Sequence, residues 1–264
     1  MKHTQSVSDL KAMAREYMLG KYGTAIVLAI TLNAISIFIG IACEFTIDTN
    51  TIFGIVVFYI VQFLLSLVTC IFSVGVYRFY LNICQNRPFN ISDLFYGFSH
   101  HPDKAILIEL ILSLIGFGCL LPFIGFLAAY ILLKRTILIV LFTVALVLGI
   151  LVFFYFSLTY SFAIALLADN KDHLSVTELL RESRRLMTGN KFRYFYMMVS
   201  FLGWMFLGLL TCGIAYLWIN SYINCTSALF YLDISGRYPF GRQETADEPS
   251  PENHEDFPDY SNLY

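Results

Sequence analysis

The feature that most constrains this chain is a series of long apolar runs. The longest, residues 136–168, contains no charged side chain. As one helix it would be about 50 Å long, at ~1.5 Å per residue, whereas the hydrocarbon core of a bilayer is about 30 Å thick. The run must therefore tilt, continue into the interface, or break, and we expect a break near Gly149.

Comparable runs predict five further spans. The chain is 58% hydrophobic but only 14% charged, where a soluble domain would carry roughly 25% charge, so lipid is the expected solvent. The expected fold is all-α, a polytopic membrane bundle of about six transmembrane helices. The end of the third span is ambiguous, because Gly116, Gly118, Pro122 and Gly125 weaken a continuous helix before its exit at Lys134-Arg135. The other spans are 24–42, 52–77, one starting at 105, 192–211 and 213–233.

Short amphipathic helices flank these spans. Residues 8–20 place apolar side chains on one helical face, with Ser8 expected as N-cap and Gly20 after the last turn. Residues 175–189 repeat this plan, with Ser175 and Glu178 in a capping-box arrangement. A third such helix is expected near 91–98. The chain thus divides into an amphipathic segment (1–23), a membrane domain (24–234) and an acidic tail expected to be disordered (235–264).

The distribution of Lys and Arg predicts the orientation. With six spans, fifteen of the 17 basic residues fall on the side of the N-terminus, and only Lys134 and Arg135 fall on the other. The positive-inside rule then places both termini in the cytoplasm. Five or seven spans remain alternatives.

The sequence also contains an internal match. Residues 79–89, FYLNICQNRPF, share six identities with residues 230–240, FYLDISGRYPF, and residues 15–22 parallel residues 184–192 with one insertion. These matches occupy equivalent topological positions. They favour a parallel repeat of spans 1–2 and 5–6, related by an axis along the membrane normal.

Several of these motifs resemble a bacterial integral membrane family called domain of unknown function 975. They cover nearly the whole chain, and residues 183–204 are the most specific part. The chain departs from the family pattern at 148–150, where the family usually has an Ile-Pro-Gly-Ile kink, and has extra apolar residues around 116–140. The resemblance implies a multi-pass plasma-membrane protein and no assigned activity. The motifs lie at residues 10–26, 77–98, 166–170, 183–222 and 228–234.

No motif indicates an enzyme, a metal site or a cofactor site. The chain has neither a metalloprotease helix motif, a nucleophile elbow, a P-loop nor a dinucleotide fingerprint. His100 and His101 adjoin a turn, where such residues are usually solvated. No soluble domain remains to hold nucleic acid, so we expect no catalytic residues, no cofactor, no metal and no nucleic-acid partner.

Polar side chains inside the spans are the better functional candidates, because each must find a partner in lipid. Glu109 lies five residues into the third span, and Asn220 and Asn224 lie one turn apart on the sixth. Interfacial anchoring and interhelical hydrogen bonds are the plainer explanations. A second group could contact anionic lipid headgroups or act only as a topology determinant. It comprises Arg181, Arg184, Arg185, Lys191 and Arg193.

Two functions fit these features. The first is a non-enzymatic membrane scaffold or accessory protein that docks protein partners through its cytoplasmic helices and acidic tail. The alternative is a transporter or permease-like protein with a polar site between repeated hairpins. An intramembrane enzyme ranks third, because the sequence offers no constellation of catalytic groups.

Overall fold

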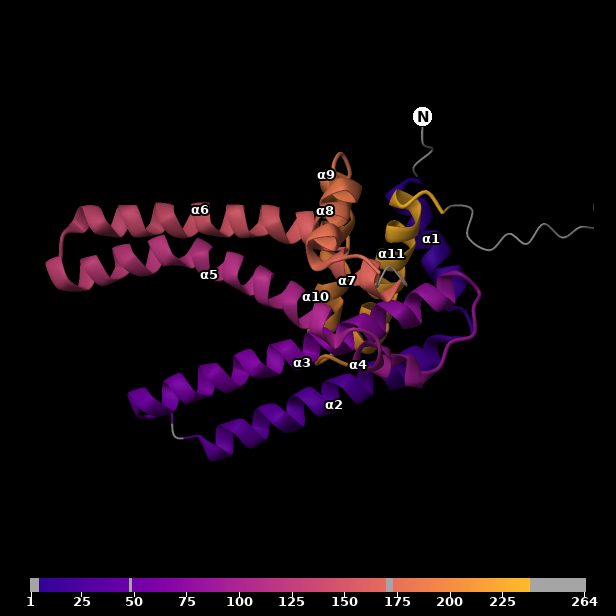
Figure 1. Cartoon of the computed structure of the whole chain (residues 1–264), viewed down its shortest axis with the longest axis horizontal. Coiled ribbons are helices and arrows are strands. Elements are labelled where there is room, and N and C mark those ends of the chain that lie inside the picture. The colour runs from indigo at the N-terminus through magenta and orange to yellow at the C-terminus, as the bar shows by residue number, and fades with distance from the viewer. Residues whose placement is uncertain (1–4, 48, 170–172, 238–264) are drawn as a thin grey trace, which may run out of the picture.

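A computed structural model describes residues 5–47, 49–169 and 173–237, and in these ranges the chain consists of helices and the turns between them. Two long helical hairpins dominate it (Figure 1). The first joins α2 (Tyr22–Thr46) to α3 (Ile52–Cys84), and the second joins α5 (Pro102–Leu133) to α6 (Thr136–Tyr160). The other helices are α1 (Val7–Met18), the 3-10 helix η1 (Ile91–Phe95), α4 (Tyr96–Ser99), α7 (Ala163–Ala168), α8 (Val176–Met187), α9 (Lys191–Val199), α10 (Leu202–Leu210) and α11 (Tyr216–Ile234).

Five helical stretches in the described ranges are long and apolar enough to cross a bilayer. They indicate a multi-pass membrane protein. The fourth stretch continues α6 into α7, and the fifth combines α9 with α10. The five are Tyr22–Thr46, Ile52–Cys84, Pro102–Leu133, Thr136–Ala168 and Lys191–Leu210.

The predicted sixth span corresponds to α11, which is not among these five. Asn220, Asn224 and Asp233 lower its mean hydropathy, and every residue from 225 to 234 is buried in protein. Helix α11 therefore packs as a core helix against α1, α2 and α3. In Figure 1, α8, α9 and α11 run across the direction of the two long hairpins.

The core lies at one end of the hairpins. It is built from the last turns of α3, from α7 and α11, and from the short helices α1 and α8, which pack across them. Phe79, Phe162 and Phe230 are fully buried there. Toward the far ends of the hairpins, apolar side chains face outward, with Phe38 75% and Leu132 81% exposed, as expected for walls that contact lipid.

The three predicted short helices are present. Helix α8 begins at Ser175 with a capping box formed with Glu178, and Gly189 adopts a positive φ of 84° just after its end. Helix α1 ends in the same way at Gly20, with φ of 74°. The N-cap of α1 is Ser6, so the prediction of Ser8 was wrong: Ser6 Oγ accepts a hydrogen bond from the amide of Asp9 at 3.2 Å.

The predicted break at Gly149 was also wrong. Helix α6 runs through this residue without interruption and ends at Tyr160, and α7 restarts at Ala163. The glycine serves packing instead, because a Cβ atom there would lie 2.5 Å from the carbonyl oxygen of Cys119 on α5. Helix α5 is likewise continuous through Pro122 and ends where Lys134 takes a left-handed conformation, at the predicted exit.

Candidate intramembrane binding site

Glu109 lies on α5 at the point where the two long hairpins meet. Its carboxylate contacts the hydroxyl of Ser113, one turn further along α5, and the thiol of Cys70 on α3. Among the described residues, no basic side chain forms an ion pair with it. A carboxylate in this position, with neutral contacts alone, is the kind of group that marks a functional site in a membrane protein.

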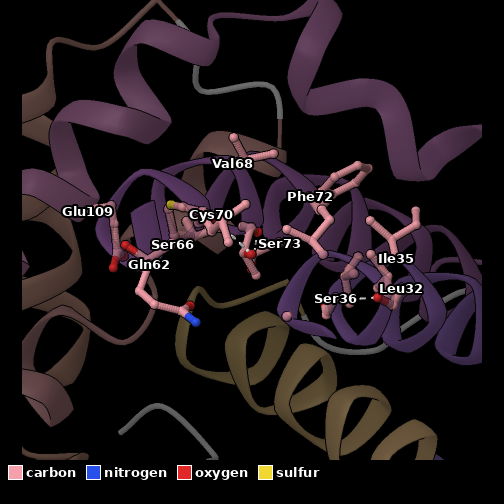
Figure 2. Close-up of a pocket in the computed structure, with 16 residues that line it drawn as sticks. Leu32, Ile35, Ser36, Gln62, Ser66, Val68, Cys70, Phe72, Ser73 and Glu109 are labelled. Atoms are coloured by element: carbon pink, nitrogen blue, oxygen red, sulfur yellow. Dashed lines mark hydrogen bonds between the residues drawn. The ribbon is translucent and has the colours of Figure 1, made fainter. Parts of the chain in front are cut away.

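A cavity of about 490 Å³ opens beside Glu109, between α2 and α3 (Figure 2). These two helices contact each other little, and the space between them forms the cavity. Its wall is mostly apolar, with leucine, isoleucine, valine and phenylalanine side chains. The polar lining residues, besides Glu109, are Ser36, Gln62, Ser66, Thr69, Cys70 and Ser73.

A second cavity, of about 320 Å³, lies on the other side of Glu109 between α5 and α6. Its polar lining consists of Ser113, Ser157, Tyr160 and Ser161. Glu109 and Ile164 line both cavities. The carboxylate therefore lies at the junction of two recesses that each carry several polar side chains.

The hydroxyl groups of the first cavity are mostly oriented as acceptors. Ser66 donates its hydrogen to Phe63 O at 2.8 Å, Thr69 to Leu65 O at 3.0 Å and Ser73 to Thr69 O at 3.1 Å. Each hydroxyl oxygen keeps lone pairs free once its hydrogen is engaged by the backbone. Together with the carboxylate, these oxygens favour a ligand that donates hydrogen bonds or carries positive charge.

Asn220 and Asn224 form a separate pair on α11. Asn224 Nδ2 donates to Asn220 Oδ1 at 3.1 Å, and Asn224 and Ser221 contact the hydroxyl of Tyr80 on α3. Neither asparagine lines the two cavities at Glu109. The structure thus does not bring the three predicted polar residues into one site.

The five predicted basic contacts divide into two groups. Arg181, Arg184 and Arg185 are exposed on α8, where Arg185 pairs with Glu182 at 2.7 Å. The other two turn toward protein: Lys191 Nζ lies 3.6 Å from the ring centre of Tyr155, and Arg193 forms an ion pair with Asp233 at 2.6 Å. Only the first group presents its charge outward.

Sequence reasoning missed two features of this region. The hydroxyls at positions 66, 69 and 73 follow the i, i+3, i+7 spacing of one helix face, and that spacing on α3 was the available signal. The second feature is an ion pair between Asp169, which follows α7, and Arg237. The hydroxyl of Tyr231 also donates to Asp169, at 2.7 Å. Nothing local in the sequence pairs residues this far apart.

The fold and these recesses define the class, a helical multi-pass membrane protein with polar groups inside its membrane-spanning part. The sequence profile described as "Protein of unknown function (DUF975)" matches residues 1–238, and the chain belongs to this family. No curated protein and no solved structure matches the chain.

Proposed function

We propose that this protein binds a cationic amphiphile in the recess between α2 and α3 beside Glu109, as a transporter or permease-like protein without catalytic activity. The observation that supports this proposal is the position of Glu109 at the junction of two largely apolar recesses that each carry several polar side chains. The sequence placed such a site between the two copies of a repeat. The larger recess instead lies within the first hairpin, and Glu109 of the second hairpin lines it.

Charge and shape together favour this ligand class. An ionised carboxylate at this depth is costly without a partner, and a ligand cation would supply that partner. The hydroxyl oxygens beside it add acceptors for an ammonium group, while the apolar wall of the larger cavity suits a hydrocarbon chain. Ser36, Val68 and Thr69 of its lining are exposed, so an amphiphile would enter this cavity from outside the hairpin.

The test is binding of dodecyltrimethylammonium to the full-length protein in zwitterionic lipid nanodiscs. We expect saturable binding that weakens at least ~10-fold in Glu109→Gln, which corresponds to about 1.4 kcal/mol. Glu44→Gln is the matched control, because Glu44 is an exposed carboxylate near the far end of α2. Equal binding by wild type and Glu109→Gln, or no binding by wild type, would overturn the proposal.

For orientation, we propose that both termini face the cytoplasm of a bacterial plasma membrane. The basic residues on the short helices α1 and α8 support this assignment through the positive-inside rule. It requires α11 to return the chain across the membrane, although polar residues lower its hydropathy. The acidic tail that the docking hypothesis invokes lies outside the described residues.

A second candidate function, docking at the cytoplasmic face, rests on the exposed charges of α8. Arg181, Arg184 and Arg185 point away from the buried stripe of Leu179, Ser183 and Met187. They would attract anionic headgroups, at roughly 1 kcal/mol per charge, and a protein partner could use the same face.

Native mass spectrometry of protein released from phosphatidylglycerol-containing nanodiscs tests the lipid part of this candidate. Replacement of all three arginines by glutamine should reduce retained phosphatidylglycerol. The control replaces Lys134 and Arg135, which are exposed at the far end of the second hairpin. Equal retention in both variants would leave the α8 charges as topology determinants alone.

A further inference from the structure

We infer that the chain is a closed ring of three related units, each a short collar helix followed by a helical hairpin. The collar helices are α1, η1 with α4, and α8. The corresponding units span residues 5–87, 88–169 and 174–237. This goes beyond a twofold repeat of spans 1–2 and 5–6, because the middle of the chain becomes a unit of the same kind. It is independent of the proposed ligand.

The three collars begin with the same five-residue pattern. Residues 6–10 read SVSDL, residues 90–94 read NISDL and residues 175–179 read SVTEL. In each, the first side chain caps the helix and is hydrogen-bonded to the acidic residue three positions later. The leucine that closes the pattern is fully buried in all three: Leu10, Leu94 and Leu179. Local capping alone would not bury the fifth residue each time.

The first and third units then stay in register. Helices α1 and α8 each have 12 residues, a glycine with positive φ follows at 20 and 189, and the next helices begin at 22 and 191. A constant offset of 169 residues relates all of these positions. The second collar is about one turn shorter, with His101 in the left-handed conformation.

Each collar packs on the hairpin of the preceding unit. Helix α1 lies on α11, η1 and α4 lie on α3, and α8 lies on α6 and α7. A small residue permits the close approach every time. On α8, the hydroxyl of Ser183 donates to Thr159 O at 3.1 Å. On α1, Ala14 O accepts from the thiol of Cys225 at 3.8 Å. On α4, a Cβ atom added to Gly97 would overlap Ile71 O.

A basic side chain joins each unit to the next. Lys104 Nζ donates to Leu174 O at 3.1 Å, and Arg193 donates to Gln5 O. Lys21 Nζ lies 5.6 Å from the ring centre of Phe89. Leu174, Gln5 and Phe89 have one property in common: each directly precedes the N-cap of a collar. The contact from Arg193 to Gln5 joins the third unit to the first and closes the ring.

The hairpins themselves carry a weaker signal. Helices α3 and α11 both end in a Schellman motif, with Asn86 and Gly236 in the left-handed conformation. Arg87 N donates to Asn82 O at 2.9 Å, and Arg237 N to Leu232 O at 3.1 Å. Relative to the sequence match, the two motifs are shifted by one residue. The second unit departs from this pattern, because α7 ends without a left-handed residue in the described part of the chain.

The ring also indicates which residues are specialised. Buried Ala25 and Leu28 on α2 correspond to buried Ala105 and Ile108 on α5. The next position is Ala29 in the first unit and Glu109 in the second. The fold of a unit therefore does not need a carboxylate there.

Cysteine cross-linking of the full-length protein in lipid nanodiscs tests the ring. In a background without the six native cysteines, three pairs are introduced and treated with a short bismaleimide, and linked peptides are identified by mass spectrometry. The pairs are Lys21→Cys with Phe89→Cys, Lys104→Cys with Leu174→Cys, and Arg193→Cys with Gln5→Cys. We expect all three intramolecular links, and none for the mismatched controls Lys21→Cys with Leu174→Cys and Lys104→Cys with Gln5→Cys.

Failure of the Arg193–Gln5 link alone would show an open chain of units, and links in the mismatched pairs would refute the arrangement. Because Arg193→Cys removes an ion pair and the variant could misfold, Arg193→Lys provides a second measurement by hydrogen exchange. The ring predicts severalfold faster exchange over residues 6–10, on the collar of the first unit. Faster exchange confined to α9 would contradict it.

Discussion

At the scale of single residues, Asp233 is the position that depends most on its hydrogen-bond and ion-pair partners. Its side chain is 1% exposed, and it receives the Arg193 guanidinium at 2.6 Å and the amide of Gln5 at 3.2 Å. A buried carboxylate of this kind depends on its partner, because its desolvation is otherwise uncompensated. These contacts join the start of α9, the end of α11 and the residue before the N-cap of α1.

We therefore expect Arg193→Met to lower the free energy of unfolding by about 3–5 kcal/mol. Arg181→Met is the control, since Arg181 is exposed on α8, and such a surface change should stay within ~0.5 kcal/mol. Unfolding of the purified protein in mixed micelles by a denaturing detergent measures both. The double variant Arg193→Met with Asp233→Asn should recover part of the loss, because it removes the orphaned charge. Equal losses for the two arginine variants would contradict this account.

Gly149 gives a second prediction at this scale. Alanine there would place a Cβ atom 2.5 Å from Cys119 O. The contacting atom belongs to the backbone of α5, so relieving the overlap requires one of the two helices to shift. We expect Gly149→Ala to destabilise the protein by roughly 1–3 kcal/mol, as for overpacked cores. Gly125→Ala on α5 is the matched control, because no atom lies within 4 Å of its added Cβ. The same detergent-unfolding assay should show that variant unchanged or slightly more stable.

At the scale of elements, the sequence was most informative where a helix has its own beginning, end and apolar face. Helix α8 shows this with a capping box at Ser175 and Glu178 and a glycine of positive φ after its last turn. The interruption of the fourth run was misplaced, because only the packing of α5 against α6 reveals that Gly149 is a contact residue. Helix α11 was read as an ordinary span, because its burial against α1 and α3 is a property of the assembled fold.

The cap of α8 yields a prediction at this scale. Loss of an N-cap hydroxyl costs on the order of 1 kcal/mol, so Ser175→Ala should speed amide exchange in the first turns of α8 by about fivefold. Thr188→Ala is the control, because Thr188 is exposed at the other end of α8, where its hydroxyl donates to Arg184 O. Hydrogen exchange with peptide-level mass spectrometry distinguishes the two. Unchanged exchange over residues 176–180 in Ser175→Ala would show that the N-cap does not stabilise the first turns of α8.

The same cap should depend on pH. The backbone amide and then the hydroxyl of Ser175 donate to Glu178 and lower the pKa of its carboxyl. A lowered pKa in the folded state means that this carboxylate stabilises α8 at and above the ordinary glutamate pKa. The contribution is lost as the pH falls through the lowered value. Exchange in the first turn should therefore accelerate on acidification in wild type, and much less in Glu178→Gln.

At the scale of the whole molecule, the membrane class followed from composition, whereas the site did not. The apolar runs predicted spans because a chain this poor in charge must face lipid. Glu109 stood out as a charge inside a span. Its surroundings come from α2, α3 and α6, and only the packing of α5 against α3 brings the carboxylate to the recess between α2 and α3. The asparagines of α11 were equally conspicuous in sequence and lie elsewhere.

The three-unit ring makes a prediction about sidedness that the sequence alone leaves open. If each unit is a collar followed by a complete hairpin, the three collars share one side of the membrane and the three hairpin tips share the other. Single cysteines report this by labelling with a membrane-impermeant maleimide in sealed spheroplasts. The exposed collar positions are Ser8, Ser92 and Thr177, and the exposed tip positions are Asn50, Arg135 and the native Cys212.

We expect the three tips to react in intact spheroplasts and the three collars to react only after permeabilisation, because the basic residues of α1 and α8 should be retained in the cytoplasm. Cys212 is the decisive position, since it follows the fifth candidate span and precedes α11. External labelling at Cys212, with a cytoplasmic C-terminus detected by a fused reporter, would require α11 to cross the membrane despite its polar residues. Labelling of Cys212 only after permeabilisation would restrict the third hairpin to the cytoplasmic face and leave two complete hairpins in the bilayer.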